Sequence, residues 1–227
     1  MYISRLPLNT ARRDAARLLA SPYRMHAAVE NAFPPGATRD CDEGRILWRV
    51  DSYGQHGGTW LYIVSPDRPD FSHIAEQCGW PSAAPGETKD YSPVLDALEP
   101  GQVWRFRLKA NPARKVAVDK GRRGNPKVVG TIQGHVTVAQ QLEWLEDRAA
   151  RNGFEIAGEP DGSSSVVVSQ RHAEKFRRNN SQVTIDTAVF DGALIVKDSR
   201  LMRRTLCHGM GRAKGFGCGL LTIMPVG

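Results

Sequence analysis

Two side chains near the start of the chain have the types and the spacing needed for proton transfer. Tyr23 and His26 stand three residues apart in a stretch that favours a helix, so both lie on one face of it. A neutral imidazole accepts a proton near pH 7, an imidazolium donates one, and a phenol donates a hydrogen bond. A tyrosine and a histidine on a helix more often pack or face solvent than act in catalysis. The same holds for the other histidines of the chain. The residues alone therefore leave acid–base catalysis and a structural role open.

A glycine-rich loop near the other end of the chain has the composition of an anion-binding turn. Five glycines stand at every second or fourth position between 209 and 219, with Arg212 and Lys214 among them. Glycine lets the backbone adopt positive φ and bring its N–H groups close to a ligand, and the two cations favour a phosphate. A P-loop or a dinucleotide-binding turn leads into a helix, whereas this loop leads into an apolar strand. The expected contacts to nucleic-acid phosphates are Gly211, Arg212, Lys214 and Gly215.

The positive charge of the chain is concentrated in one segment. The 227 residues carry a net charge of +7, and nine Lys or Arg but only one acid fall between 105 and 127. A basic stripe of this density is typical of a nucleic-acid binder, although a solvated surface would also be basic. The expected contacts in this segment are Arg105, Arg107, Lys109, Arg114, Lys115, Arg122, Arg123 and Lys127. Two further expected contacts are Arg24, beside Tyr23, and Arg171, in a second basic cluster.

The remaining composition argues against several classes of site. The cysteines at 41, 78, 207 and 218 form no C-x-x-C pair, which disfavours a zinc site or a disulfide framework and fits a reducing compartment. Asp and Glu form no cluster with metal-site spacing, so we expect neither a metal nor another cofactor. No apolar run approaches the length of about 18 residues that a membrane helix needs, and no signal-peptide core is present. We therefore expect a cytoplasmic protein without membrane contact.

The elements that must position these residues follow from periodicity and from capping signals. In the first half, Ser21 and Pro22 predict the start of a helix that runs to about residue 31. The segment 66–101 is rich in Pro, Gly and acid and predicts a long connection with at most a short helix at 93–98. The other elements expected in this half are a strand over 1–8, a helix over 11–19, and strands over 45–50, 59–65 and 102–108.

The second half repeats the same alternation of helices and strands. Apolar residues recur with helical period over 138–151, and Gly153 ends that helix. Asp191-Gly192 predicts a hairpin turn between two strands. The other elements expected here are strands over 154–157, 164–170, 183–190, 193–196 and 220–224, and a helix over 199–206. The order is close to two tandem βαββαβ units, which predicts an α+β fold of two ferredoxin-like domains, 1–112 and 113–227. Sheets of this kind often carry RNA on one face.

Four motifs in this order resemble one known family. They are SPYRMH at 21–26, RFRLKANP at 105–112, QLEWL at 141–145 and the glycine-rich loop. The combination resembles the CRISPR-associated endoribonucleases of the E-subtype Cascade complex, and the resemblance covers nearly the whole chain. It implies tandem ferredoxin-like domains that bind a CRISPR repeat RNA hairpin and cleave at its 3′ base without a metal. It also implies 5′-hydroxyl and 2′,3′-cyclic phosphate ends, and contact with other Cascade subunits through the bound RNA.

The resemblance also implies roles for individual residues. His26 matches the family's catalytic histidine and Tyr23 its partner tyrosine. Lys214 matches a loop cation, and Arg105, Arg107 and Lys109 match a basic strand. The chain departs from the family at Ala213, where relatives often have glycine, and at Asn31, where a relative can carry lysine.

Three other functions are compatible with parts of this pattern. A non-catalytic RNA-hairpin-binding subunit would have the same basic stripe, with a His26 that only packs. A scaffold subunit would hold guide RNA with little regard for hairpin sequence. A small-molecule nucleotidyl enzyme would need a helix directly after the glycine loop, and this sequence has none there. The family resemblance favours the processing nuclease over all three.

Overall fold

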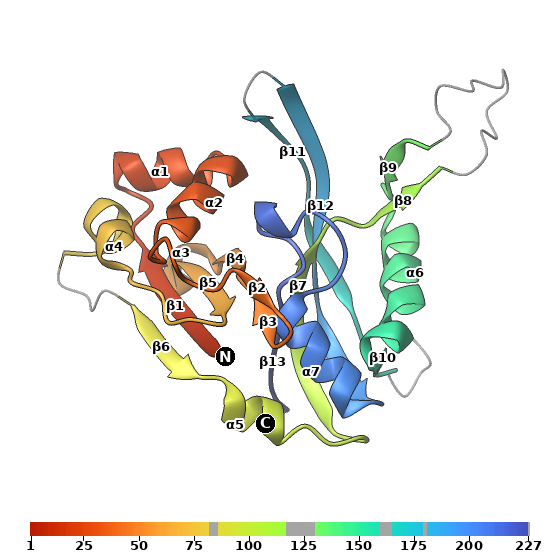
Figure 1. Cartoon of the computed structure of the whole chain (residues 1–227). Coiled ribbons are helices and arrows are strands. Elements are labelled where there is room, and N and C mark those ends of the chain that lie inside the picture. Colours follow the sequence, from red (N-terminus) through yellow and green to blue (C-terminus); the bar gives the residue numbers. More distant parts are fainter. Residues whose placement is uncertain (82–85, 117–129, 159–164, 179–180, 227) are drawn as a thin grey trace, which may run out of the picture.

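The computed structural model of the chain contains two antiparallel sheets that lie side by side, each covered by helices (Figure 1). The N-terminal sheet is coloured red to yellow in Figure 1, and the C-terminal sheet green to blue. The residues that the structure describes are 1–81, 86–116, 130–158, 165–178 and 181–226.

The N-terminal sheet has the strand order β4-β5-β1-β6, with every neighbouring pair antiparallel. Its strands are β1 (Tyr2–Leu8), β4 (Leu47–Ser52), β5 (Thr59–Ser65) and β6 (Glu87–Asp90). Three helices cover one face of this sheet: α1 (Arg13–Leu19), α2 (Pro22–Glu30) and α4 (Ser72–Cys78). Their apolar residues form one buried cluster with Leu6, Leu61 and Ile63 of the strands. This is one complete βαββαβ unit, because the first and third strands lie at its centre.

The C-terminal sheet repeats this plan with the strand order β10-β12-β7-β13. Its strands are β7 (Val103–Ala110), β10 (Phe154–Ile156), β12 (Ser181–Val196) and β13 (Leu221–Pro225). Helices α6 (Val138–Ala149) and α7 (Ser199–His208) join them, and an additional long strand, β11 (Val167–Arg178), pairs with β12. Thr137 caps α6 through a capping box with Gln140, and Gly153 follows the helix in the left-handed conformation. The predicted fold of two tandem ferredoxin-like units is therefore confirmed.

The remaining elements are short and lie in the connections. They are β2 (Asp40–Cys41), β3 (Gly44–Arg45), α3 (Gly54–Gly57), α5 (Ser92–Asp96), β8 (Ala113–Lys115), β9 (Ile132–Gly134), η2 (Ala150–Asn152) and η3 (Lys214–Phe216). The pairs β2–β3 and β8–β9 form separate two-stranded ribbons.

Strand β7 corrects the predicted division of the chain. The strand predicted over 102–108 is present, but it pairs with β12 and β13 and so opens the second unit instead of closing the first. The fourth strand of the first sheet is β6, in the segment predicted as a long connection, which also contains α4. Neither element was predicted, because both are short and the segment 66–101 around them is rich in Pro and Gly. The sheets change between Asp90 and Val103, earlier than the predicted boundary after residue 112.

The hairpin turn predicted at Asp191-Gly192 is wrong. Strand β12 continues through both residues, and Gly192 pairs with Phe106 of β7. A Cβ atom at Gly192 would lie 3.0 Å from the carbonyl oxygen of Ser165 and 2.9 Å from a methyl group of Val166. The glycine therefore allows the backbone at 165–166 to approach closely. From sequence alone, a glycine with this role cannot be told from a glycine in a turn.

Arg49 joins the two sheets. Its side chain on β4 is buried. Nη1 donates to the carbonyl oxygens of Arg107 in β7 (2.9 Å) and of Leu220, directly before β13 (2.8 Å). Nη2 donates to Thr222 Oγ1 and to Asp51 Oδ2, and Nε donates to Asp51 Oδ1, all at 2.8 Å. All five guanidinium N–H groups can thus be satisfied at once, which makes burial of this cation tolerable.

Candidate active site

Helix α2 presents Tyr23 and His26 on its outer side. Ser21 caps the helix by accepting a hydrogen bond from the Arg24 amide (3.4 Å), and proline occupies the first helical position, both as predicted. Met25 and Val29 are buried on the inner side. The opposite side therefore faces outward, where Tyr23 is 36% exposed and has no side-chain partner among the residues that the structure describes.

The imidazole of His26 lies against the terminal glycine loop. A Cβ atom built on Gly215 would stand 3.8 Å from both Cε1 and Nε2 of the ring. Gly215 belongs to η3, which packs on α2. The fold thus brings together an acid–base group of α2 and the terminal glycine loop, the juxtaposition on which the catalytic hypothesis depends.

The sequence of the loop fixes its path. Gly217 has φ +77°, and a Cβ atom there would stand 2.6 Å from the ring of Trp48, so only glycine fits. Ala213 also adopts the left-handed conformation (φ 61°), which is uncommon for a residue other than glycine. The Gly219 amide donates to the carbonyl oxygen of Lys109 (2.7 Å), which ties the loop to β7. These contacts hold the loop next to His26.

Lys214 is a half-buried cation at the edge of this loop. Burial, and after it the charge of Arg45, lower the pKa of its ammonium group below the ordinary value, and Asp40 opposes this. The side chain of Lys214 has no hydrogen-bond or ion-pair partner within the described part of the chain. Arg45 lies in the β2–β3 ribbon, bonded to Asp40 at 3.3 Å, and its Nε is buried without a partner in the described structure. Two neighbouring cations held this way favour binding of an anion. Arg45 was not predicted as part of this site, because a single arginine in a short strand is not a distinctive pattern.

A groove runs beside α2 and extends the site toward β11. It has a volume of about 270 Å³ and lies between α1–α2 and the outer strand. Phe216 of the loop forms part of it and packs on Phe176 with ring centroids 4.8 Å apart. His172 and Lys175 of β11 line the opposite side. The groove therefore joins the His26 loop to the second basic cluster of the sequence.

The three cations of β7 differ from one another. Arg107 donates to both carboxylate oxygens of Asp191 (2.7 and 3.0 Å), and this pairing raises the pKa of its guanidinium. Lys109 Nζ lies 2.7 Å from Glu174. Arg105 is exposed and has no side-chain partner among the described residues. Two of the three predicted strand contacts are thus already neutralised by acids of the same sheet.

The other predicted phosphate contacts are scattered. Arg24, Arg114, Lys115, Gly211 and Arg212 are exposed. Arg171 is exposed on β11 but donates to Gln141 (3.0 Å) and to the carbonyl oxygen of Val136. Arg122, Arg123 and Lys127 lie outside the described residues.

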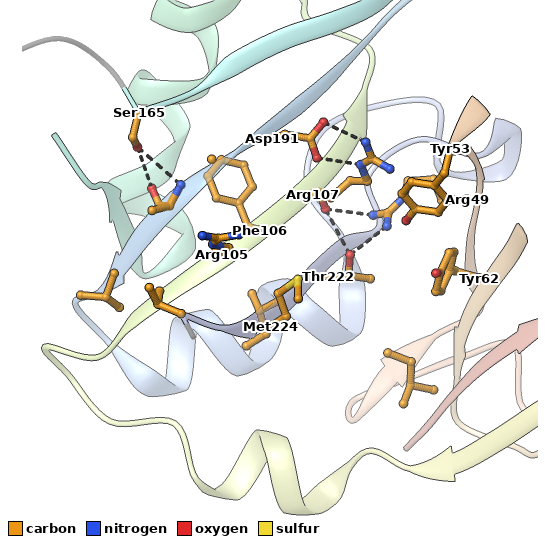
Figure 2. A pocket seen from close by; sticks show the side chains of 16 residues that line it. Arg49, Tyr53, Tyr62, Arg105, Phe106, Arg107, Ser165, Asp191, Thr222 and Met224 are labelled. Atoms are coloured by element: carbon orange, nitrogen blue, oxygen red, sulfur yellow. Dashed lines mark hydrogen bonds and ion pairs between the residues drawn. The ribbon is translucent and has the colours of Figure 1, made fainter. Parts of the chain in front are cut away.

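A larger groove lies between the two sheets (Figure 2), and no residue of the glycine loop is among the described residues that line it. Its volume is about 760 Å³, and β4, β7, β12 and β13 contribute most of its lining. Figure 2 shows that Arg107 is bonded to Asp191 and that Arg49 is bonded to Thr222 and to the backbone of Arg107. Of the described residues that line this groove, none is a histidine or a cysteine. Because its described lining lacks these side chains, and because its Arg49, Arg107 and Asp191 are already bonded to other groups of the protein, we place the candidate active site at α2 and η3.

Cys207 and Cys218 are poor nucleophiles in this fold. Burial raises the pKa of the Cys207 thiol to about 11 and that of Cys218 to about 12. At neutral pH both remain protonated, and the thiol is the unreactive form. Among the described residues, no group of three His, Cys, Asp or Glu side chains is arranged to hold a metal ion. Within the same residues, no helix is long and apolar enough to cross a membrane.

Comparison with known proteins connects this site to a family. Residues 1–225 match the profile of the family described as CRISPR associated protein. The chain belongs to this family. The match covers nearly the whole chain, so the family resemblance predicted from the four motifs is confirmed.

Individual relatives extend over the full chain as well. The CRISPR-associated endoribonuclease Cse3 of Thermus thermophilus is 32% identical over 232 residues, covering 99% of this chain and 100% of its own. A structure of CRISPR endoribonuclease Cse3 bound to a 19-nucleotide RNA superposes with a TM-score of 0.80 at 30% identity, covering 99% of this chain and 100% of that one. The CRISPR system Cascade subunit CasE of Escherichia coli is 25% identical over 209 residues, covering 90% of this chain and 92% of its own.

Proposed function

We propose that this protein is an endoribonuclease that binds a CRISPR repeat RNA hairpin and cuts it at its 3′ base to give guide RNAs. The observation that carries the proposal is the position of the His26 ring, whose Cε1 and Nε2 each lie 3.8 Å from a Cβ atom built on Gly215 of the loop. Its relative Cse3 is named an endoribonuclease and has a solved structure with bound RNA, which supports the same substrate class here. Its relative CasE is a Cascade subunit, so we propose that the product RNA also links this protein to other Cascade subunits.

The proposed reaction uses the RNA's own nucleophile. The 2′-hydroxyl of the scissile nucleotide attacks the adjacent 3′-phosphate in line with the departing 5′-oxygen. The products are a 2′,3′-cyclic phosphate and a 5′-hydroxyl. The attack is intramolecular, so holding the nucleotide in the in-line pose supplies much of the rate acceleration.

The side chains at α2 and η3 fit this reaction. His26 takes the proton from the 2′-hydroxyl or gives one to the 5′-oxygen. Tyr23, one turn earlier, has no hydroxyl partner within the described residues and donates a hydrogen bond that orients the phosphate or the 2′-hydroxyl. Lys214 and the loop N–H groups stabilise the charge that develops on the phosphorane oxygens. Each of these roles is filled by the chain's own groups, so the proposal needs no metal or other cofactor.

A modified substrate tests the mechanism directly. A repeat hairpin with 2′-deoxy at the scissile nucleotide should bind nearly as tightly as the all-RNA hairpin but should not be cut. Cutting of the deoxy substrate would refute the mechanism. Cutting of the all-RNA hairpin should persist in EDTA, and its loss there would refute metal independence. Retention of the all-RNA hairpin without any cleavage would identify a binding subunit instead of an enzyme.

A further inference from the structure

The inner nitrogen of the His26 ring faces a carboxylate. Nδ1 is buried from solvent and has no hydrogen-bond partner in the described structure. The only acidic group within 4.0 Å among the described residues is Glu30, whose Oε1 lies 3.9 Å away, one turn later on α2. Buried ring nitrogens normally have a partner, and Glu30 is in position to supply one.

Glu30 is itself held in place from the other side. Arg39 Nε donates to its second oxygen, Oε2, at 3.2 Å. Nη1 of Arg39 is fixed by the carbonyl oxygens of Pro34 (3.2 Å), Pro35 (3.3 Å) and Ala37 (2.7 Å), in the turn that follows α2. One carboxylate oxygen is therefore anchored, and the other is left facing the imidazole.

The two ring nitrogens consequently have different surroundings. Nε2 lies at Gly215, where the phosphate is proposed to bind, and Nδ1 lies 3.9 Å from Oε1 of Glu30. The hydrogen bond made by one nitrogen of an imidazole decides which nitrogen carries the proton in the neutral ring. Catalytic hydrogen bonds are often long without substrate and shorten in the substrate complex.

We infer that Glu30 is a positioning residue for His26, held by Arg39, that accepts a hydrogen bond from Nδ1–H and keeps Nε2 unprotonated toward the RNA. The inference rests on the proposed function, because it concerns the same imidazole. When Nε2 takes the proton from the 2′-hydroxyl, the ring becomes a cation beside the Glu30 carboxylate. That proton then leaves to the 5′-oxygen or to solvent, and no other reactant is needed.

The protonated nitrogen can be identified without RNA. In the full-length protein labelled with ¹⁵N, the ring shifts of His26, assigned with His26→Ala, should report a proton on Nδ1 at alkaline pH. In Glu30→Ala the proton should move to Nε2, the form that a free histidine side chain favours. The matched control is Glu76→Ala, which removes an exposed glutamate from α4 and should leave the ring shifts unchanged. Identical ring shifts in wild type and Glu30→Ala would overturn the inference, whatever His26 does in catalysis.

Cleavage provides the second measurement. Glu30→Ala should lower the single-turnover rate about 10- to 100-fold without weakening hairpin binding, because a misplaced catalytic group costs rate and not affinity. Arg39→Ala should give a smaller loss in the same direction. An unchanged rate in Glu30→Ala would also overturn the inference. If His26→Ala cleaves as fast as wild type, the proposed function fails, and the ring shifts still decide whether Glu30 orients the imidazole.

Discussion

Strand β7 and the terminal glycine loop both carry cations expected to bind phosphate, and they differ in what those cations contact. On β7, Arg107 is bonded to Asp191 and Lys109 to Glu174. In the loop, Lys214 has no partner among the described residues, and burial, followed by the charge of the neighbouring Arg45, lowers its pKa. A cation paired inside the protein contributes little to phosphate binding, whereas an unpaired one gains from an anion. The density of basic residues in a sequence therefore locates a basic surface but not the residues that act on a phosphate.

The largest effect should follow from changing the imidazole beside the loop. His26→Ala should lower the rate of hairpin cleavage by about 10²–10⁴, the range for loss of a general acid or base. Hairpin affinity should stay close to wild type, because the proposed role of the ring is proton transfer and not phosphate binding. Single-turnover cleavage and equilibrium binding measure the two quantities. His135→Ala, far along the chain near the start of α6, is the control and should cleave normally. Equal losses in both variants would show that histidine content, and not the α2 site, is responsible.

Where β4 meets β7 through Arg49, the largest effect should be on stability. Asp51 and Arg49 have side chains only 2% exposed, so Asp51→Ala leaves a buried guanidinium with two donors unpaired. We expect the free energy of unfolding to fall by about 3–5 kcal/mol, measured by denaturant titration. The control is Asp14→Ala, which breaks the exposed pair with Arg17 (3.4 Å) and should cost less than about 1 kcal/mol. Similar losses in both variants would contradict the structural role of the buried pair.

In contrast to Asp51→Ala, replacement of Lys214 in the loop should change the cleavage rate and not the free energy of unfolding. Lys214→Ala should lower the cleavage rate by about 10²–10³, the loss typical of one group that stabilises transition-state charge. It should not destabilise the protein, because burial already disfavours the charged ammonium. The control is Lys197→Ala, an exposed lysine paired with Glu155 at 2.8 Å, which should leave cleavage unchanged. If Lys214→Ala destabilised the protein but cleaved at the normal rate, Lys214 would have a structural role and not a role in cleavage.

Local signals predicted the fold better than they predicted the pairing of its strands. Ser21, Pro22 and Gly153 mark helix ends through backbone chemistry that acts within a few residues, and those ends are correct. Strand β7 was assigned to the wrong sheet because its partners lie far later in the chain, in β12 and β13. Alternation shows which face of a strand is apolar, but not which strand it pairs with.

The candidate site was predictable in its residues but not in its connections. Tyr23, His26 and the glycine loop stand out by type and spacing and by their resemblance to a family. Glu30 and Arg45 do not, because an acid one turn after a histidine and an arginine in a two-residue strand are common in any sequence. Only the fold brings Arg39 against Glu30 and Arg45 near Lys214.

The smallest expected effect compares two cations of the same strand. Arg105 has no side-chain partner among the described residues, whereas Lys109 lies 2.7 Å from Glu174. If Arg105 contacts one RNA phosphate, Arg105→Ala should weaken hairpin binding and reduce the slope of log K against log salt concentration by about 0.7–0.9, the value for one released counterion. Lys109→Met should leave that slope nearly unchanged, because its charge is already neutralised within the sheet. Binding titrations at several salt concentrations measure both slopes. A larger change for Lys109 than for Arg105 would mean that the Glu174 pair opens when RNA binds, and that pairing in the free protein does not identify the phosphate contacts.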